Sequence, residues 1–346
     1  YADTLGSKSI AIGDVALVSQ NFTTATDAFN IAIGHEAGNA LTTGVKNTIM
    51  GGLAGDGLTT ADECVIIGYN AGSLVMTGHD NTLVGANAGT DIAGGESNTY
   101  IGFSVGSNTT EGDQNTGMGR DALFTNTTGS NNTAVGYSAL VANTTAANNS
   151  AFGHNALVAN TTGTGNNAFG VQTIDACTTG DYNTAFGHVA LSTNVSSDGN
   201  TGFGSQALYA ATGARNSALG DTAGYAITSG SNNLLLGADA GRTGSPGGNI
   251  TTASNILVIG DENISASHIQ TDWTVASDQR DKTDFTALDL GLDFVNALAP
   301  VTYKWDKRSK YGDKTADDYN LLDQTPDGTH KEDWLDIGFK AQEVQA

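Results

Sequence analysis

Short apolar segments recur along most of the chain, each preceded by Asn and Thr and followed by Gly. The motif is Asn-Thr-x-Φ-Gly-x-x-Ala-(Leu/Gly), where Φ is a large apolar residue. It is clearest as NTAVGYSAL around Gly136 and NTAFGHVAL around Gly187. Its Thr, Val, Ile and Phe residues favour a strand of about five residues. Apolar residues at helical spacing are absent here, so the pattern predicts strands and turns rather than helices.

The motif glycine returns at every seventeenth position, ten times in succession, from Gly34 to Gly204. The next step, to Gly220, is one position shorter, and Gly237 follows at the full spacing, while Gly13 and Gly260 are outlying copies at irregular spacing. The repeat glycines are Gly34, Gly51, Gly68, Gly85, Gly102, Gly119, Gly136, Gly153, Gly170, Gly187, Gly204, Gly220 and Gly237.

So regular a period is typical of proteins in which each repeat stacks on the next. The part of the repeat that reads Ala-Leu-x-x-Asn-Thr-Thr-Gly predicts a second short extended stretch and a turn. The sequence therefore predicts an all-β fold, a β-solenoid in which each seventeen-residue repeat forms one coil. Successive motif glycines would then lie about 4.7–4.9 Å apart along the axis.

Three columns of equivalent residues follow from this stacking. The Asn four residues before each motif glycine, replaced once by Cys64, would form a ladder of side-chain amides. The Ala column, three residues after the glycine, would mark close backbone approach and in part chain–chain contacts. The Φ column would form the apolar core: Ile33, Met50, Ile67, Val84, Ile101, Met118, Val135, Phe152, Phe169, Phe186, Phe203, Leu219 and Leu236. Because one narrow coil buries little surface, we expect three chains to bundle as a homotrimer.

Composition limits the function. With 36 acidic and 14 basic residues the formal net charge is −22, which argues against nucleic acid and anionic lipid as partners. The sequence contains no run of 18 apolar residues, so it predicts no membrane-spanning segment. Two cysteines far apart give no disulfide framework. Because the chain begins at Tyr1 without Met, we expect it to be a fragment or a trimmed product.

The composition changes after Gly260. Ten of the 14 basic residues and all three prolines lie after residue 241. Leu288, Leu292 and Val295 are spaced as on one face of a helix, so the segment 286–299 before Pro300 predicts a short amphipathic helix. The segment 301–305 alternates like a strand, and the polar residues 306–334 predict a loop.

The Asn-Thr-Ala-Φ-Gly-x-x-Ala-Leu repeats, over roughly residues 9–260, resemble those of phage tail fibres and bacterial surface fibres. They are also similar to the head repeats of trimeric autotransporter adhesins, which have a shorter period. Those heads are left-handed parallel β-rolls in a trimer. The resemblance implies a fibre with a surface role.

Three sequence blocks at the C-terminal end carry a second resemblance. Ser277-Asp278-Gln279-Arg280-Asp281-Lys282, then Ala-Pro-Val-Thr-Tyr at 299–303 and Gly-Phe-Lys-Ala-Gln-Glu-Val at 338–344, resemble the intramolecular chaperone domain of phage tailspikes and tail fibres, peptidase family S74. In that family the domain trimerises the chain, helps it fold and then cuts itself off. Such domains continue into long helices, so the resemblance implies a small α+β domain that is C-terminally incomplete here.

The resemblance also implies the chemistry of the cut. Ser277 would be the nucleophile, Lys282 the base, and Ala276–Ser277 the scissile bond. A serine hydroxyl is a weak nucleophile until a base takes its proton, and a neutral lysine can do so. Enzymatic activity would be at most this single-turnover autoproteolysis, and we expect no cofactor and no metal.

Other candidate sites have plainer interpretations. His35, His154 and His188 each follow a motif glycine and would bind a metal only if that column met at a trimer axis. Asp121, Asp221 and Asp239 would suit Ca²⁺, but solvated acidic faces are commoner. Exposed aromatics would stack on sugars, although packing is the simpler interpretation: Tyr69, Phe103, Phe124, Tyr137, Tyr209 and Tyr225. After a cut at Ser277, His268 and Trp273 would lie at the new fibre tip.

These observations predict four regions: a connector with one outlying repeat (1–29), the solenoid (30–241), a terminal coil and tip (242–276) and the chaperone domain (277–346). The predicted function is the structural and receptor-binding part of a homotrimeric phage tail fibre in the virion. Its partners would be a host cell-surface glycan or protein and other tail proteins at the N-terminal end. The alternatives are a bacterial trimeric surface adhesin and a polysaccharide depolymerase. The depolymerase needs a pair of carboxylates across a groove, which no repeat presents.

Overall fold

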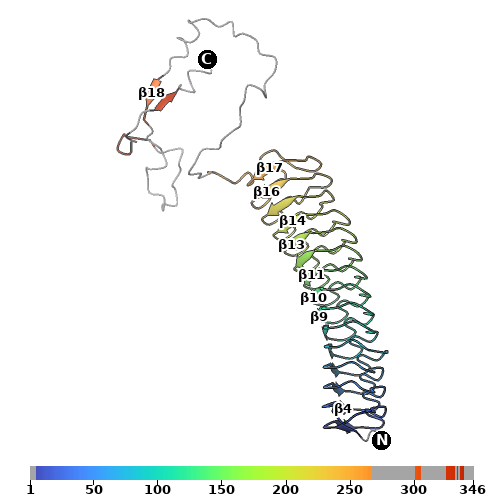
Figure 1. Ribbon diagram of the computed structural model, residues 1–346. Coiled ribbons are helices and arrows are strands. Elements are labelled where there is room, and N and C mark those ends of the chain that lie inside the picture. The colour runs from blue at the N-terminus through green and yellow to red at the C-terminus, as the bar shows by residue number, and fades with distance from the viewer. Residues whose placement is uncertain (1–4, 267–300, 305–324, 332, 334–335, 339–346) are drawn as a thin grey trace, which may run out of the picture. The chain divides into compact units, whose positions relative to one another are not determined.

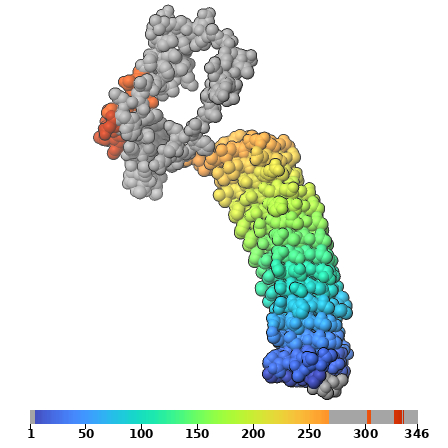
Figure 2. Space-filling view, in the orientation of Figure 1, coloured from blue at the N-terminus to red at the C-terminus, as the bar shows by residue number. Residues whose placement is uncertain are grey.

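The computed structural model describes residues 5–266, 301–304, 325–331, 333 and 336–338, and it divides into two compact units, 1–268 and 269–346. The first unit is a column of stacked coils (Figures 1 and 2). No helix occurs among the described residues, so none of them forms a helical membrane span. The predicted all-β solenoid is confirmed, whereas the predicted helix at 286–299 lies outside the described residues.

One three-residue strand per coil builds a 15-stranded parallel sheet in chain order. A short pair, β1 (Gly6–Ser7) and β3 (Thr26–Asp27), accompanies it at the N-terminal end. The strands of the large sheet are β2 (Ile10–Ile12), β4 (Ile31–Ile33), β5 (Thr48–Met50), β6 (Val65–Ile67), β7 (Thr82–Val84), β8 (Thr99–Ile101), β9 (Thr116–Met118), β10 (Thr133–Val135), β11 (Ser150–Phe152), β12 (Asn167–Phe169), β13 (Thr184–Phe186), β14 (Thr201–Phe203), β15 (Ser217–Leu219), β16 (Leu234–Leu236) and β17 (Leu257–Ile259).

The register follows the sequence period. Thr133 pairs with Ser150 and Val135 with Phe152, so equivalent residues of successive coils lie side by side. The outlying repeats around Gly13 and Gly260 join the same sheet through β2 and β17. The strands are shorter than predicted. The expected second extended stretch is wrong as well, because turns occupy the Ala-Leu part of each coil.

The prediction that the Φ column forms the core is wrong for the single chain. The middle residue of each strand is the buried one: Ile49, Ile66, Leu83 and Tyr100 are fully buried, whereas the neighbouring Met50 remains 42% exposed. Side chains alternate across a strand, so burying the middle residue turns the first and third residues outward. The core lies inside each coil.

The Ala column and the residue after it complete this core. Ala139 and Leu140 are fully buried, as are their equivalents in most coils, so the Ala column is an internal packing position and not a chain–chain contact. Leu140 has a φ of 51°. A left-handed backbone costs a non-glycine residue about 1–2 kcal/mol, which burial of a leucine side chain, about 1.5–3 kcal/mol, offsets.

The Asn column forms the expected buried ladder. The Asn115 side chain donates to the Gly129 carbonyl at 2.8 Å and to Asn98 Oδ1 at 3.1 Å, and its own Oδ1 accepts from the Asn132 backbone N–H at 2.9 Å. Each amide thus satisfies polar groups of its own coil and of the next. Cys64 keeps the backbone link to the preceding coil, because its N–H donates to Asn47 Oδ1 at 2.9 Å. Burial raises the pKa of the Cys64 thiol to about 11.

The motif glycine is required by its backbone and by the next coil. Gly51 has a φ of 137°, and a Cβ added there would lie 2.5 Å from the Gly68 carbonyl oxygen. The adjacent Gly52 has no such conflict, since its nearest neighbour would be the Tyr69 ring at 3.8 Å. Coils therefore touch backbone to backbone at the Gly51 column, which explains its regularity.

The second unit contains one described pair of strands, β18 (Val301–Tyr303) and β19 (Asp336–Gly338), which pair antiparallel. The strand predicted at 301–305 is confirmed over its first three residues. The pairing of β18 with β19 brings together two of the three sequence blocks that resemble the chaperone domain. Strand β18 belongs to the second block, and β19 ends at Gly338, where the third block begins.

Candidate polar pocket at the last coil

The last full coil departs from the repeat. The step from Gly237 to Gly260 is longer than the regular period, and the additional residues form a loop at 242–249. Ser245, Pro246, Gly247 and Gly248 make a turn in which the Gly248 N–H donates to the Ser245 carbonyl at 2.8 Å. Proline second and a glycine of φ 82° third suit a type II turn.

The loop is anchored on both sides. The Ser245 hydroxyl accepts from the Gly241 N–H at 3.0 Å and donates to the Arg242 carbonyl at 2.9 Å. At its far end the Ile250 N–H donates to the Gly241 carbonyl at 2.8 Å, and the Ile250 side chain is buried in the core. The loop is therefore held at its base while its other side chains remain at the surface.

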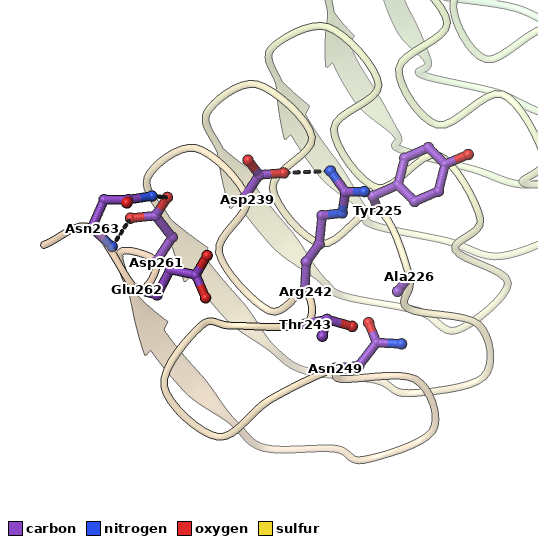
Figure 3. Close-up of a pocket in the computed structure, with 9 residues that line it drawn as sticks. All are labelled: Tyr225, Ala226, Asp239, Arg242, Thr243, Asn249, Asp261, Glu262 and Asn263. Carbon is purple, nitrogen blue, oxygen red and sulfur yellow. Dashed lines mark hydrogen bonds and ion pairs between the residues drawn. The ribbon is translucent and has the colours of Figure 1, made fainter.

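Beside this loop lies an open polar pocket of about 410 Å³ (Figure 3). Its lining comes from four segments: the turn after β15, the turn after β16, the loop itself and the residues that follow β17. The lining residues are Tyr225, Ala226, Asp239, Arg242, Thr243, Asn249, Asp261, Glu262 and Asn263.

On one side of the pocket Arg242 joins Asp239 and Tyr225. Its guanidinium forms an ion pair with Asp239 and lies over the Tyr225 ring, 5.2 Å from the centroid. A hydrogen bond of 2.6 Å from the Thr222 hydroxyl, together with Arg242, lowers the pKa of the Asp239 carboxyl below its usual value. The Asp239 carboxylate is thus already bound by Arg242 and Thr222, so it is poorly placed to bind the Ca²⁺ considered above.

The other side of the pocket carries free hydrogen-bonding capacity. Asp261 accepts from the Asn263 backbone N–H at 2.9 Å and from its side-chain amide at 2.8 Å, which fixes the segment after β17. The exposed Glu262 carboxylate lies over Gly244, whose φ of 99° disfavours a side chain. Together with the Asn249 amide and the Thr243 hydroxyl, the pocket offers donors and acceptors of the kind that bind hydroxyl groups.

Four of the six aromatic residues singled out as possible sugar platforms pack on protein groups. Tyr225 has Tyr209 stacked at 5.1 Å as well as Arg242 over its ring. Tyr137 stacks on His154 at 5.3 Å, and Arg120 lies over the rings of Phe103 and Tyr137. For these four aromatic residues the structure agrees with the packing interpretation.

The histidines that follow motif glycines do not gather into a site within the chain. His35 lies 3.7 Å from the Glu36 carboxylate, and His154 belongs to the Tyr137 stack. Within the described part of the chain, no group of three or more His, Cys, Asp or Glu side chains is arranged to hold a metal ion.

Sequence reasoning missed the polar pocket, although the long step between Gly237 and Gly260 was its signal. The residues proposed for self-cleavage, Ala276, Ser277 and Lys282, lie outside the described residues, as do the suggested tip residues His268 and Trp273.

Comparison with known proteins adds one finding. Residues 277–346 match the model of the Peptidase_S74 family, described as the chaperone of endosialidase. Neither the curated proteins nor the solved structures searched contain a significant match to the chain. The segment 277–346 is therefore similar to an intramolecular chaperone domain, and it follows a long parallel β-solenoid.

Proposed function

We propose that the chain is the distal part of a homotrimeric phage tail fibre or tailspike, carried on the virion and contacting the host cell surface. The observation that supports this is the order of its parts: a long, stiff β-solenoid followed directly by a segment that matches a chaperone of endosialidase. A chaperone segment of this kind serves a fibre whose chains must assemble in register before they are stable.

In this proposal the four regions have separate roles. Residues 1–29 connect to other tail proteins, 30–241 form the shaft, 242–276 form the terminal coil and tip, and 277–346 trimerise the chain. Ser277 and Lys282 then cut the Ala276–Ser277 bond, as in the family that these residues resemble. The cut makes assembly irreversible, because the released shaft no longer carries the domain that brought the chains together.

Receptor recognition is proposed at the polar pocket of the last coil. The regular coils repeat one backbone path, whereas the loop at 242–249 and the segment after β17 follow a path found once along the column. Both ring faces of Tyr225 are occupied, so recognition would depend on hydrogen bonds to hydroxyl groups rather than on stacking. A surface polysaccharide of the host fits this chemistry.

The trimer and the cut are tested together by native mass spectrometry of the intact protein. We expect a species of three chains, and, where cleavage occurs, a second series in which each chain has lost the residues from Ser277 onward. A stable monomer, or a dimer as the largest species, would contradict the proposed assembly.

Receptor binding is tested with Glu262→Ala, compared with Glu96→Ala, which removes an exposed carboxylate from the shaft away from the pocket. We expect Glu262→Ala to weaken adsorption to host cells by about tenfold, the effect of one lost hydrogen bond to a charged group. Glu96→Ala should adsorb like the unmodified protein. Equal adsorption by both variants would remove the pocket from the proposal.

A further inference from the structure

The outward side of the large sheet is a continuous uncharged stripe. It consists of the first and third residues of strands β2 and β4 to β17, none of which is charged. Threonine is the commonest first-position residue and is half-buried, while the third-position residues include the Φ column. Met50, Met118 and Leu219 are 42%, 42% and 57% exposed. We call this surface the outer sheet face.

Aromatic rings line up on strands β11 to β14. Phe152, Phe169, Phe186 and Phe203 stack in sequence, with ring centroids 4.7, 4.3 and 4.7 Å apart. Beyond Phe203 the column changes to leucine, and a shallow hollow of about 350 Å³ opens between Phe203, Leu219 and Leu236. The exposed lining of this hollow is almost entirely apolar. A partner surface with projecting apolar side chains would fill it.

The area of the outer sheet face approaches that of a standard interface. Fifteen strands about 4.8 Å apart and three residues wide give a face about 65 Å long and about 10 Å across, on the order of 650 Å². Exposed apolar patches beyond a few hundred Å² mark interaction sites, and a standard interface uses about 800 Å² per partner.

The periodicity of the face indicates what covers it. Apolar side chains recur at every strand spacing along the whole column, so a matching partner must repeat with the same spacing over the same length. A second copy of this chain, parallel and in register, has this property throughout. In such an arrangement like columns meet, and the Phe stack of one chain lies beside that of another.

Charge disfavours contact between copies through the acidic columns outside this face. Residues 1–241 carry 18 acidic and four basic side chains. Two copies that met through these charged columns would repel each other, because like charges in contact are unfavourable. The outer sheet face has no charge to repel, so identical chains can pack there without that cost.

We propose that the outer sheet face is the surface through which copies of this chain pack against one another, with the Φ column nearest the common axis. This rests on the proposed trimer and goes further by assigning its interface along the shaft. It also gives the Φ column its role: these residues are half-exposed in one chain and become buried on assembly.

The test compares two exposed apolar residues on different faces. Leu219 is 57% exposed on the outer sheet face, and Val195 is 48% exposed in a bend away from it. Leu219→Asp and Val195→Asp add the same charge. We expect Leu219→Asp to abolish the contacts along the shaft, so that the three-chain species is lost once residues 277–346 have been cut off, and Val195→Asp to retain it. Circular dichroism should stay unchanged for both, since neither side chain belongs to the core of a coil.

A second measurement does not depend on disruption. Leu219→Cys should be joined between chains by a short bifunctional maleimide in high yield, whereas Val195→Cys should not. Cys64 and Cys177 are fully buried and should not react. If the unmodified chain is trimeric but Leu219→Cys stays unlinked and is freely alkylated, the interface assignment is overturned while the trimer stands. If the unmodified chain is a monomer, the proposed function fails first.

Discussion

Ser277→Ala is expected to leave the chain uncut, because it removes the only atom proposed to attack the Ala276–Ser277 bond. Lys282→Ala should have the same effect by removing the base. Lys282→Arg should also prevent cleavage, since a guanidinium stays protonated and cannot accept the serine proton. We expect the unmodified chain to cut faster as pH rises, because a larger fraction of the lysine is then neutral.

The measurement is the mass of each chain over time after refolding. The three variants should still trimerise, since assembly precedes the cut. A product that begins at a residue other than Ser277 would refute the assignment of the bond. Full cleavage of Lys282→Arg would refute the assignment of the base.

Asn149→Asp is expected to be the most damaging single substitution in the shaft. Asn149 is 1% exposed, donates its amide to the Gly163 carbonyl at 2.9 Å and accepts from the Asn166 N–H at 2.9 Å. Aspartate keeps the acceptor but loses the donor, which leaves a buried carboxylate facing a carbonyl oxygen. An uncompensated buried charge costs about 3–5 kcal/mol.

The neighbouring Asn148 provides the control, because it is exposed and has a φ of 62°, a conformation that aspartate tolerates. Asn148→Asp should change the free energy of unfolding by less than about 0.5 kcal/mol. Thermal unfolding at one protein concentration compares the two. The carboxyl introduced by Asn149→Asp should have a higher pKa in the folded chain than in the unfolded chain. The loss in free energy of unfolding should therefore be complete at pH values above that raised pKa. It should become smaller as the pH falls toward about 4. Equal melting temperatures for the two variants at neutral pH would show that the Asn ladder contributes little.

Much of the fold could be predicted from the sequence, because each repeat forms its hydrogen bonds and packing contacts with the repeats on either side. The seventeen-residue period set the parallel register, since equivalent residues of consecutive coils must lie side by side once the coils stack. The Asn column followed for the same reason: a buried amide with both a donor and an acceptor can bond its own coil and the next. The glycine column also followed, because the Gly51 position combines a positive φ with contact to the backbone of the next coil.

The candidate pocket was harder to predict from the sequence. The long step between Gly237 and Gly260 marks where the repeat changes, but the pocket gathers Tyr225, Arg242 and Glu262 from three segments. Their proximity depends on the path of the loop, which the anchoring of Ser245 and Ile250 decides. The blocks from Ser277 onward, in contrast, point to a family and a chemistry through their motifs alone.

The sequence by itself determined that this chain stacks its repeats as parallel coils and ends in a chaperone-like segment. Only the tertiary structure decided which side of each strand faces inward. A strand of three residues has one middle side chain, and the turn at Ala139 and Leu140 closes the coil over Ala134, which leaves Val135 outside. Hydrophobicity alone favours burial of the larger Val135. Size does not decide the choice, since Ile66, Leu83 and Tyr100 are fully buried at the same middle position in other coils. The path of the chain decides it, because the middle position of every strand faces the inside of its coil.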